Sequence, residues 1–346
     1  MKKEIVGFGL IGCGRAGMIH GRNFAGGVGG ARIVAVMDTN VELRTQAAKE
    51  LHALRSYAEV SKILADPEVD AVVIATPTEF HRDIAVAAAK AGKHILCEKP
   101  MARNEKECDE MISAADRYKV KLQIGFMRRF ASGFIEAKRR IDSGEIGNVV
   151  QVKSLTHGPN IPKPWMCDIK QSNGPLAEVN SHDIDTLRWF TGSELVEVYA
   201  IGENYRCPDV RKKFPDFYDN VMLVGRFANG MQGFIGGAQG VMYGYDSRCE
   251  VLGLKGILFV GSLASESVMS CNASGMNQPV MKSWQKLYED AYAAEDEDFA
   301  ECIVNNRRPC VTGYDGRMAV AVVNAGNESI RTGKPVKLRV PKGRKK

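Results

Sequence analysis

The apolar residues in the first third of the chain fall into short continuous runs, separated by longer segments with helical spacing. Each run has the length of a buried strand, and the runs cover residues 5–11, 33–37, 71–75, 94–97 and 120–124. Apolar residues recur every three or four positions in the segments between them, chiefly at 41–54, 80–91 and 105–118. Strands that alternate with helices predict right-handed crossovers and a doubly wound parallel sheet.

The pattern changes after about residue 125, where apolar and alternating runs follow one another with fewer helices between them. These runs lie at 149–155, 195–201, 221–227, 232–235, 249–254 and 257–260. Ala228-Asn229-Gly230 is typical of a hairpin turn. Helices are expected at 132–143, 176–190, 284–304 and 316–330. We therefore predict two domains, an α/β domain over 1–125 and an α+β domain with a mostly antiparallel, open-faced sheet over 126–346.

Composition narrows the class of protein without identifying it. The chain has 346 residues, 45% hydrophobic and 25% charged, as in an ordinary globular protein, and a net charge of +6. Part of that charge lies in the tail 342–346, which predicts a solvated end rather than a nucleic-acid site. Neither a membrane span nor a signal peptide is expected. The nine cysteines show no metal-binding spacing, which favours reduced thiols, no metal site and a cytoplasmic location.

A Gly-rich turn directly follows the first apolar run. The turn reads Gly12-Cys13-Gly14-Arg15-Ala16-Gly17 and fits G-x-G-x-x-G, which in this context is typical of a dinucleotide site. The first glycine allows the tight turn, the second lets the pyrophosphate approach the backbone, and the third lets the helix pack near the strand. Free N–H groups at the start of that helix then face the phosphates.

The second apolar run ends at an acidic residue, Asp38, about 20 residues beyond the glycines. A carboxylate at this position can accept hydrogen bonds from the adenosine ribose and would repel the 2′-phosphate of NADP. We therefore expect NAD as the cofactor. NADP remains the alternative, since Arg15 and Arg44 are available for a 2′-phosphate.

Polar residues stand where three of the predicted parallel strands end. Thr76-Pro77, Glu98-Lys99-Pro100 and the segment 125–128 all fall at carboxyl ends, where ligands bind in open α/β sheets. Lys99 is the first candidate for chemistry, because a partly desolvated lysine changes its pKa readily. An exposed loop lysine is the alternative. His81 is expected to cap the following helix, with a nicotinamide contact as its other possible role.

A second group of candidates lies in the segment 178–185. If this segment is helical, Glu178 and His182 lie one turn apart on one face, with Asp185 a further step along it. A carboxylate beside an imidazole raises the basicity of the imidazole and suits it to act as a general base. A solvated helix start is the alternative. His157 and Trp165 are assigned to a Pro-rich loop that either covers the cleft or lies on the surface.

Taken together, these motifs resemble those of the glucose-fructose oxidoreductase, inositol dehydrogenase and MocA (Gfo/Idh/MocA) family. The resemblance extends over nearly the whole chain. It rests on GLIGCGRAG at 9–17, ATPTEFH at 75–81, CEKP at 97–100, GFMRRF at 125–130 and NGPLAEVNSHDIDTLRWFTG at 173–192. It implies an NAD-dependent dehydrogenase acting on a secondary hydroxyl of a polyol, inositol or sugar derivative.

The resemblance also implies roles for particular residues. Lys99 matches the essential lysine of the family and His182 its histidine, while Glu178 stands where aspartate is commoner. Ser172-Asn173-Gly174-Pro175 replaces a run of glycines. A cis peptide before Pro100 and assembly to a homodimer or homotetramer through open sheet faces are further implications. Besides the Gly-rich turn and Asp38, we assign cofactor contacts to Thr76, Pro77, His81, Glu98 and Lys99, and substrate contacts to Lys99, Met127, Arg128, His157, Trp165, Glu178 and His182.

Two other functions are compatible with the same scaffold. One is a glycosidase that uses tightly held NAD to oxidise a sugar transiently, and it would release an aglycone without net NADH. The other is a regulator that senses the cofactor and performs no chemistry. The presence of both Lys99 and His182 argues against a regulator, which needs no proton acceptor. The dehydrogenase is the function that we expect.

Overall fold

The computed structural model describes residues 5–341 and divides the chain into two compact units. The first unit contains the residues up to Phe130 together with Asp290–Arg317. The second contains Ala131–Glu289 and the residues from Met318 onward.

The first unit is built on a six-stranded sheet with the order β3-β2-β1-β4-β5-β6. All its neighbouring strands are parallel. The strands are β1 (Val6–Ile11), β2 (Ala31–Met37), β3 (Arg55–Tyr57), β4 (Ala71–Ile74), β5 (His94–Glu98) and β6 (Leu122–Gly125). The strand order reverses between β1 and β4, where a doubly wound sheet opens a crevice at its carboxyl ends. The predicted parallel sheet is confirmed.

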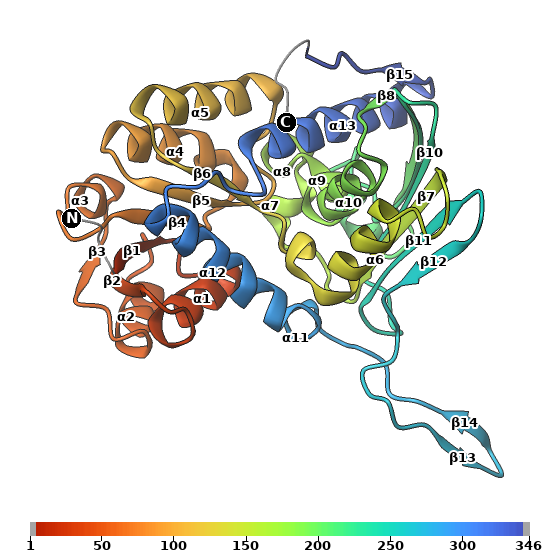
Figure 1. The fold of residues 1–346 in the computed structure, drawn as a ribbon, viewed down its shortest axis with the longest axis horizontal. Helices are drawn as coiled ribbons and strands as arrows, with labels where there is room; N and C mark the ends of the chain where they lie inside the picture. The colour runs from red at the N-terminus through yellow and green to blue at the C-terminus, as the bar shows by residue number, and fades with distance from the viewer. Residues whose placement is uncertain (1–4, 342–346) are drawn as a thin grey trace. The chain divides into compact units, whose positions relative to one another are not determined.

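Helices cover both faces of this sheet (Figure 1). One face carries α4 (His81–Lys90) and α5 (Glu105–Tyr118), and the other carries α1 (Arg15–Arg22), α2 (Val41–Glu50) and α12 (Glu289–Val304). Shorter helical segments are η1 (Asn23–Gly27), α3 (Val60–Leu64), η2 (Thr78–Phe80) and η3 (Met127–Phe130). The alternation of strands and helices therefore gives the layers that the sequence predicts.

An aromatic cluster joins α12 to the start of the chain. Phe8 of β1 stacks on Phe24 with ring centroids 3.8 Å apart, and the ring of Phe299 meets Phe8 edge-on at 6.2 Å. All three side chains are buried. Burial of one such ring contributes roughly 1.5–3 kcal/mol. The first unit thus depends on a helix that follows β7 to β12 of the second sheet in sequence.

The second unit contains a seven-stranded sheet with the order β12-β11-β7-β10-β9-β8-β15. The strands are β7 (Val149–Gly158), β8 (Leu195–Glu203), β9 (Asn220–Phe227), β10 (Gln232–Gln239), β11 (Asp246–Gly253), β12 (Ile257–Val260) and β15 (Val336–Lys337). Only β7 and β10 pair in parallel. The predicted hairpin joins β9 and β10, with Gly230 at φ +87°. A mostly antiparallel sheet is confirmed.

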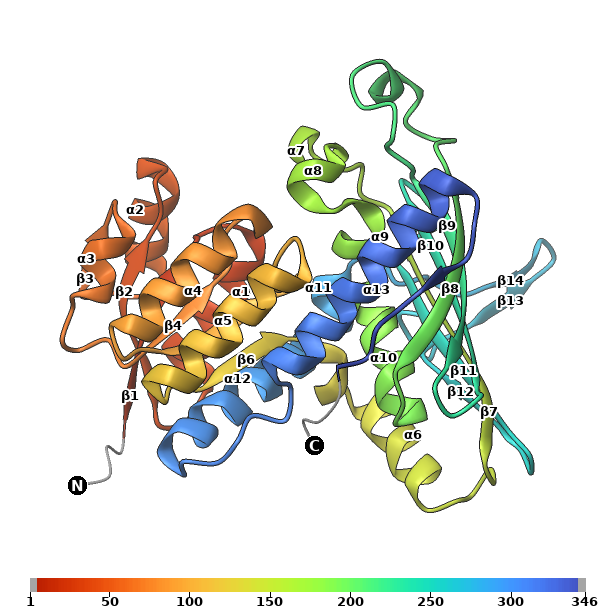
Figure 2. The same ribbon diagram turned by 90° about the horizontal axis from the view of Figure 1, so that it is seen from above.

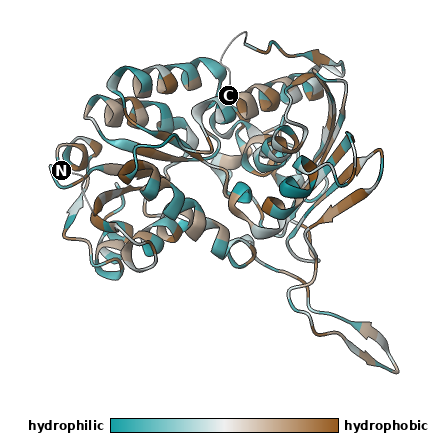
Figure 3. Ribbon diagram, in the orientation of Figure 1, coloured by the Kyte–Doolittle hydropathy of each residue, from teal (hydrophilic) through white to brown (hydrophobic). Residues whose placement is uncertain are grey.

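One face of this sheet is packed against helices and the other is open (Figure 2). The packed face carries α10 (Ser181–Thr191) and the part of α13 (Gly313–Thr332) that belongs to this unit. On β8, Val198 and Ala200 are buried, while the alternate residues Tyr199 and Ile201 are exposed. Hydrophobic stretches recur along the strands (Figure 3). Exposed apolar side chains at the open face include Tyr199, Ile201, Met222, Val224, Leu252 and Phe259.

The remaining elements of the second unit are short or lie at its edges. They are α6 (Ser132–Asp142), α7 (Pro164–Cys167), α8 (Ile169–Ser172), α9 (Gly174–Glu178), η4 (Pro208–Lys212), α11 (Trp284–Leu287) and the hairpin of β13 (Ser270–Asn272) with β14 (Gly275–Asn277). The hairpin is not predicted from the sequence, because its strands are three residues each and wholly exposed. No helix among residues 5–341 has the length and apolar character needed to cross a membrane.

Candidate functional site

The Gly-rich turn connects β1 to α1 and has the shape that a dinucleotide requires. Gly12 adopts φ +97°, and a Cβ atom there would lie 2.6 Å from the carbonyl oxygen of Ala75. A Cβ atom on Gly17 would lie 2.0 Å from the carbonyl oxygen of Gly12, whereas one on Gly14 would meet nothing within 4 Å. Two glycines therefore serve close packing, and Gly14 leaves open space at the start of α1. That arrangement fits a bound pyrophosphate.

Asp38 links the end of β2 to this turn. Its Oδ2 accepts a hydrogen bond from the backbone N–H of Cys13 at 2.8 Å, and its Oδ1 accepts one from Asn40 at 2.8 Å. The half-buried carboxylate thus stands beside the turn, where a ribose would be held. The guanidinium of Arg44 donates to the carbonyl oxygens of Asp38 and Thr39, both at 3.3 Å. These contacts agree with NAD as the cofactor.

Lys99 directly follows β5 at the carboxyl edge of the sheet and is half-buried. Its backbone N–H donates to Oε2 of Glu98 at 3.0 Å. The Lys99–Pro100 peptide bond is cis, as the family resemblance implies. Glu98 is only 5% exposed. Burial alone would raise the pKa of Glu98, but a hydrogen bond and the charge of His20, together with the charge of Lys99, lower it. Lys99 therefore stands beside an ionised carboxylate.

His81 lies inside the unit, between two backbone segments that the sequence assigns to the cofactor site. Its Nδ1 is 2.9 Å from the carbonyl oxygen of Pro100, and its Nε2 is 2.8 Å from that of Thr76. Burial lowers the pKa of His81, although both carbonyl contacts oppose the shift. These contacts tie the end of β4 to the turn after Lys99. His81 is the first residue of α4, after the cap residue Phe80, and its ring contacts these two segments, so it does not cap the helix as predicted. Its structural role is instead to join the two segments. Its contact with the cofactor stays a prediction, as do those of Thr76 and Pro77.

Met127 and Arg128 follow β6 in the short helix η3, and both are buried, with exposed fractions of 2% and 1%. Their neighbour Arg129 pairs with Asp315 at 2.9 Å. The structure therefore places both predicted substrate residues inside the first unit, at the carboxyl end of a strand. Their contact with substrate remains a prediction.

The helix predicted at 176–190 is wrong in one respect, because it is broken between Glu178 and Ser181. Glu178 ends α9, and His182 is the second residue of α10. Asn180 causes the break, since its side-chain amide donates to Asp183 Oδ2 at 2.8 Å and to the carbonyl oxygen of Gly236 at 3.3 Å. Glu178 and His182 therefore do not share one continuous helical face. Glu178 is half-buried and His182 is 5% exposed.

Asp183 fixes the start of α10 against β7, a role that the sequence analysis did not find. Its carboxylate accepts hydrogen bonds from Ser154 Oγ at 2.5 Å and Thr156 Oγ1 at 2.7 Å, in addition to the one from Asn180. The carboxylate is fully buried. A buried carboxylate with three donors holds the adjacent backbone firmly. The one available signal is the unbroken polar run Asn180 to Asp183 before an apolar helix.

His157 does not lie in a loop, as the sequence analysis expected, because β7 continues through Gly158. Pairing with β10 and β11 carries this strand past the end of its apolar run. Nδ1 of His157 is 2.6 Å from the hydroxyl oxygen of Tyr243, which donates to Asp246 at 3.0 Å. Burial lowers the pKa of His157. Trp165 lies in α7 and is half-buried.

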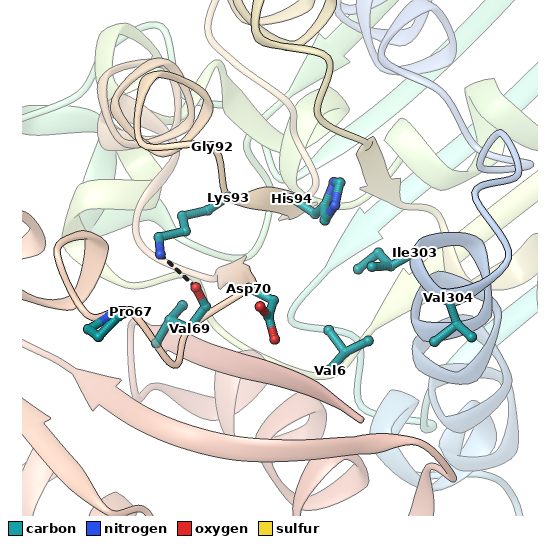
Figure 4. Close-up of a pocket in the computed structure, with 9 residues that line it drawn as sticks. All are labelled: Val6, Pro67, Val69, Asp70, Gly92, Lys93, His94, Ile303 and Val304. Carbon is teal, nitrogen blue, oxygen red and sulfur yellow. Dashed lines mark hydrogen bonds between the residues drawn. The ribbon is translucent and has the colours of Figure 1, made fainter. Parts of the chain in front are cut away.

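A pocket in the first unit lies at the opposite, amino-terminal edge of the parallel sheet (Figure 4). Its polar groups serve the fold. Lys93 donates to the carbonyl oxygens of Val69 at 2.7 Å and Asp66 at 2.9 Å, and Asp70 accepts from the N–H of Gly7 at 2.8 Å. The pocket is therefore separate from the strand ends that carry the candidate residues. No group of three or more potential metal ligands occurs within residues 5–341.

Comparison with known proteins agrees with this geometry. A family model described as an oxidoreductase family with an NAD-binding Rossmann fold matches residues 6–126, and that of the GFO/IDH/MocA C-terminal domain matches residues 134–259. The chain is 34% identical over 331 residues to scyllo-inositol 2-dehydrogenase (NAD(+)) of Bacillus subtilis strain 168, with 96% of each chain covered. It is 31% identical over 333 residues to myo-inositol 2-dehydrogenase of Thermotoga maritima, covering 95% of this chain and 98% of that one.

Solved structures extend the comparison to the fold. Scyllo-inositol dehydrogenase from Lactobacillus casei, solved with bound NAD(H) and scyllo-inositol, superposes with a TM-score of 0.89 at 26% identity. The match covers 96% of this chain and 99% of that one. The glycine turn and the six-stranded parallel sheet lie in the region matched by the first family model, and most of the mixed second sheet lies in the region matched by the second. The chain therefore belongs to the Gfo/Idh/MocA family of NAD-dependent oxidoreductases.

Proposed function

We propose that this protein is an NAD-dependent inositol-type dehydrogenase that oxidises a secondary hydroxyl of a cyclic polyol. The observation that carries the proposal is Lys99, presented at the carboxyl end of β5 beside the ionised Glu98, in the unit that holds the dinucleotide turn. The whole-length relatives named as scyllo- and myo-inositol dehydrogenases support the substrate class.

Three side chains handle the hydroxyl proton in this proposal. NAD, when bound, supplies the redox chemistry by taking a hydride from the carbinol carbon. The ammonium group of Lys99 donates a hydrogen bond to the hydroxyl oxygen, where negative charge develops in the transition state. His182 accepts the hydroxyl proton as general base. Glu178 orients these two groups or binds a neighbouring hydroxyl.

Binding of the cofactor and of the remaining hydroxyls falls to other predicted residues. The turn Gly12 to Gly17 holds the pyrophosphate and Asp38 the adenosine ribose. Thr76, Pro77, His81 and Glu98 belong to the nicotinamide side. We assign hydroxyl contacts and substrate shape to Met127, Arg128, His157 and Trp165, the first pair in the first unit and the second pair in the second.

We further propose a homodimer or homotetramer that assembles through the open face of the second sheet. Contiguous exposed apolar side chains mark interaction sites on soluble proteins. Tyr199, Ile201, Met222 and Val224 come from the adjacent strands β8 and β9, and Phe259 from β12 is 72% exposed. A cytoplasmic location is proposed as well, since Cys13 and the other cysteines of the described chain are free thiols. Analytical ultracentrifugation of the purified protein tests the assembly.

Absorbance of NADH during a substrate screen tests the catalytic proposal. The screen covers myo- and scyllo-inositol, aldoses and glycosides, each with NAD and with NADP. We expect net NADH from at least one inositol, with kcat reduced by about 100-fold or more in Lys99→Ala and His182→Ala and NAD affinity within about threefold. Unchanged kcat in both variants would contradict the proton pathway. Aglycone release without net NADH would favour the glycosidase, and NAD binding without turnover would favour the regulator.

A further inference from the structure

A buried histidine bridges two acidic side chains within the first unit. His20 lies in the last turn of α1, and none of its surface is exposed. Its Nδ1 is 2.6 Å from Oδ1 of Asp296, and its Nε2 is 3.1 Å from Oε1 of Glu98. The ring of Tyr292 meets the imidazole edge-on at 5.4 Å. The imidazole therefore connects α12 on one side to the end of β5 on the other.

With Glu98 and Asp296 both ionised, the bridge requires both ring nitrogens of His20 to be donors. Burial raises the pKa of Asp296, but the charge and hydrogen bond of His20 oppose that shift. Neutral imidazole has one N–H, whereas imidazolium has two, and two carboxylates offer acceptors only. Burial disfavours the imidazolium, but the charge and hydrogen bond of Asp296, together with those of Glu98, raise the pKa of His20 well above 6.5. The position also suits a cation, since the carbonyl end of a helix carries partial negative charge.

Glu98 extends the bridge to the lysine. One of its oxygens faces His20, and the other accepts the backbone N–H of Lys99 at 3.0 Å. Gly125 on the neighbouring strand gives this carboxylate its room, because a Cβ atom there would lie 3.3 Å from Glu98 Oε2. Asp296 is held in turn by Asn23, whose amide donates to its second oxygen at 2.7 Å. Each carboxylate thus uses one oxygen for His20 and the other for a different partner.

We infer that His20 is a positioning residue that, anchored by Asp296, fixes Glu98 and through it the strand end presenting Lys99. The inference deepens the proposed function and rests on the role given there to Lys99. The same helix begins at the Gly-rich turn, so one imidazole ties the helix that receives the pyrophosphate to the strand that carries the ammonium group. A displacement of about 1 Å in such an arrangement can lower turnover about 100-fold.

Three variants test the bridge by hydrogen-bond complementarity. In His20→Gln the side-chain amide has one donor group and one acceptor, so its oxygen faces a carboxylate whichever way it turns. In Asp296→Asn the amide oxygen can still accept from His20. In the double variant the amide introduced at position 296 donates to the one introduced at position 20, which in turn donates to Glu98, and Asn23 keeps its acceptor. The double variant therefore restores every hydrogen bond of the bridge without the charges of His20 and Asp296.

We expect His20→Gln to lower kcat by about 10- to 100-fold, with KM for myo-inositol within about threefold of the wild-type value. Asp296→Asn should lose less than about threefold, and the double variant should recover kcat to within about threefold of wild type. Wild-type kcat in folded His20→Gln would overturn the inference. A double variant that regains the thermal midpoint but not kcat would overturn it too, because the bridge would then serve stability alone.

A second readout separates this inference from the proposed function. Competitive acetylation with acetic anhydride, followed by mass spectrometry, reports the reactivity of Lys99 without any turnover, and the exposed Lys90 serves as the internal reference. We expect the labelling rate of Lys99 to change at least about threefold in His20→Gln and to return in the double variant. If no polyol is oxidised while these changes occur, the proposed function fails and the positioning role stands. An identical Lys99 rate in all variants would refute the positioning role.

The wild-type protein provides a test that needs no variant. NMR of protein labelled with 15N-histidine at pH 8 should show both ring nitrogens of one histidine protonated, whereas an ordinary solvated histidine is neutral at that pH. Comparison with His20→Gln assigns the signal if that variant folds. If the variant does not fold, the wild-type spectrum alone decides whether the bridge exists, because the bridge predicts one histidine ring with both nitrogens protonated. Absence of any imidazolium at pH 8 would overturn the bridge.

Discussion

Replacing Glu295 by glutamine should stabilise the protein relative to wild type, and this gain should grow as the pH rises. Glu295 lies on α12 with none of its surface exposed, and neither carboxyl oxygen has a hydrogen-bond partner within residues 5–341. Burial raises the pKa of Glu295 well above 4.5. The charge of His20 opposes this shift, and the charges of Glu98, Asp296 and Asp298 add to it. The folded protein therefore favours the protonated, uncharged form of Glu295.

The size of the effect follows from proton linkage. Because the folded-state pKa of this acid is raised, folding takes up a proton at any pH between the unfolded pKa of 4.5 and the folded value. The free energy of unfolding contributed by Glu295 then falls by about 1.4 kcal/mol for each pH unit. Glutamine does not titrate. The variant should therefore gain stability relative to wild type as the pH rises above 4.5, by about 1.4 kcal/mol for each pH unit up to the folded-state pKa.

Hydrogen exchange is the suitable assay, since it reads each unit separately. Trp165, Trp189 and Trp284 all lie in the second unit, so tryptophan fluorescence does not report on the first. Exchange of peptides from β1 and β4, corrected for intrinsic rates, gives the free energy of opening of the first unit at each pH. Glu297→Gln is the matched control, because Glu297 is exposed on the same helix. A Glu295→Gln difference that stays constant from pH 5.5 to pH 7.5 would refute the reasoning.

Three further predictions concern other carboxylates. Asp38→Ala should lower NAD affinity by about 10-fold or more and raise the NADP/NAD ratio of kcat/KM, and an unchanged ratio would contradict the ribose contact. Asp183→Ala should remove the carboxylate that Ser154, Thr156 and Asn180 share as acceptor and lower the free energy of unfolding by about 2–4 kcal/mol, measured by urea unfolding of the second unit. The pKa of Asp66 is lowered, although burial opposes the shift, because Arg55 donates to the carboxylate at 2.6 and 3.0 Å. The stability that ionised Asp66 contributes is therefore present above the unfolded-state pKa and is lost as the pH falls through the folded-state pKa. Asp66→Asn should lower the free energy of unfolding by about 1.5–3 kcal/mol at pH 7 and make it fall less steeply at acidic pH. An acid dependence identical to that of wild type would exclude this role.

The parts of the fold that local patterns determine could be predicted. The long apolar runs of the first unit are strands buried on both sides, so the hydrophobic pattern alone identifies them without tertiary information. Residues 105–118 form a helix with the predicted bounds, because Asn104 caps its first turn by accepting from Glu107 at 3.0 Å. Strand β3 has no such signal, since its three residues are half-buried or exposed.

Long-range contacts explain what the sequence pattern missed at the site. Asn180 is an ordinary polar residue in sequence, and it ends a helix only because Gly236 and Asp183 present acceptors to it. His20 stands eight residues after Gly12, yet its partners lie 78 and 276 residues away. Periodicity describes one element at a time and therefore cannot reveal a contact of that kind. The glycine turn was found because its chemistry is local.

The aromatic contact between Phe8 and Phe299 has a consequence for how the protein is made. At about 5–20 residues per second, a ribosome needs roughly 10–30 s to proceed from residue 130 to residue 299. During this interval the nascent first unit lacks α12, and the apolar surfaces of Phe8 and Phe24 that this helix covers have no native cover. Chaperones that shield apolar surface during translation should therefore matter more for this chain than for one whose amino-terminal domain is contiguous.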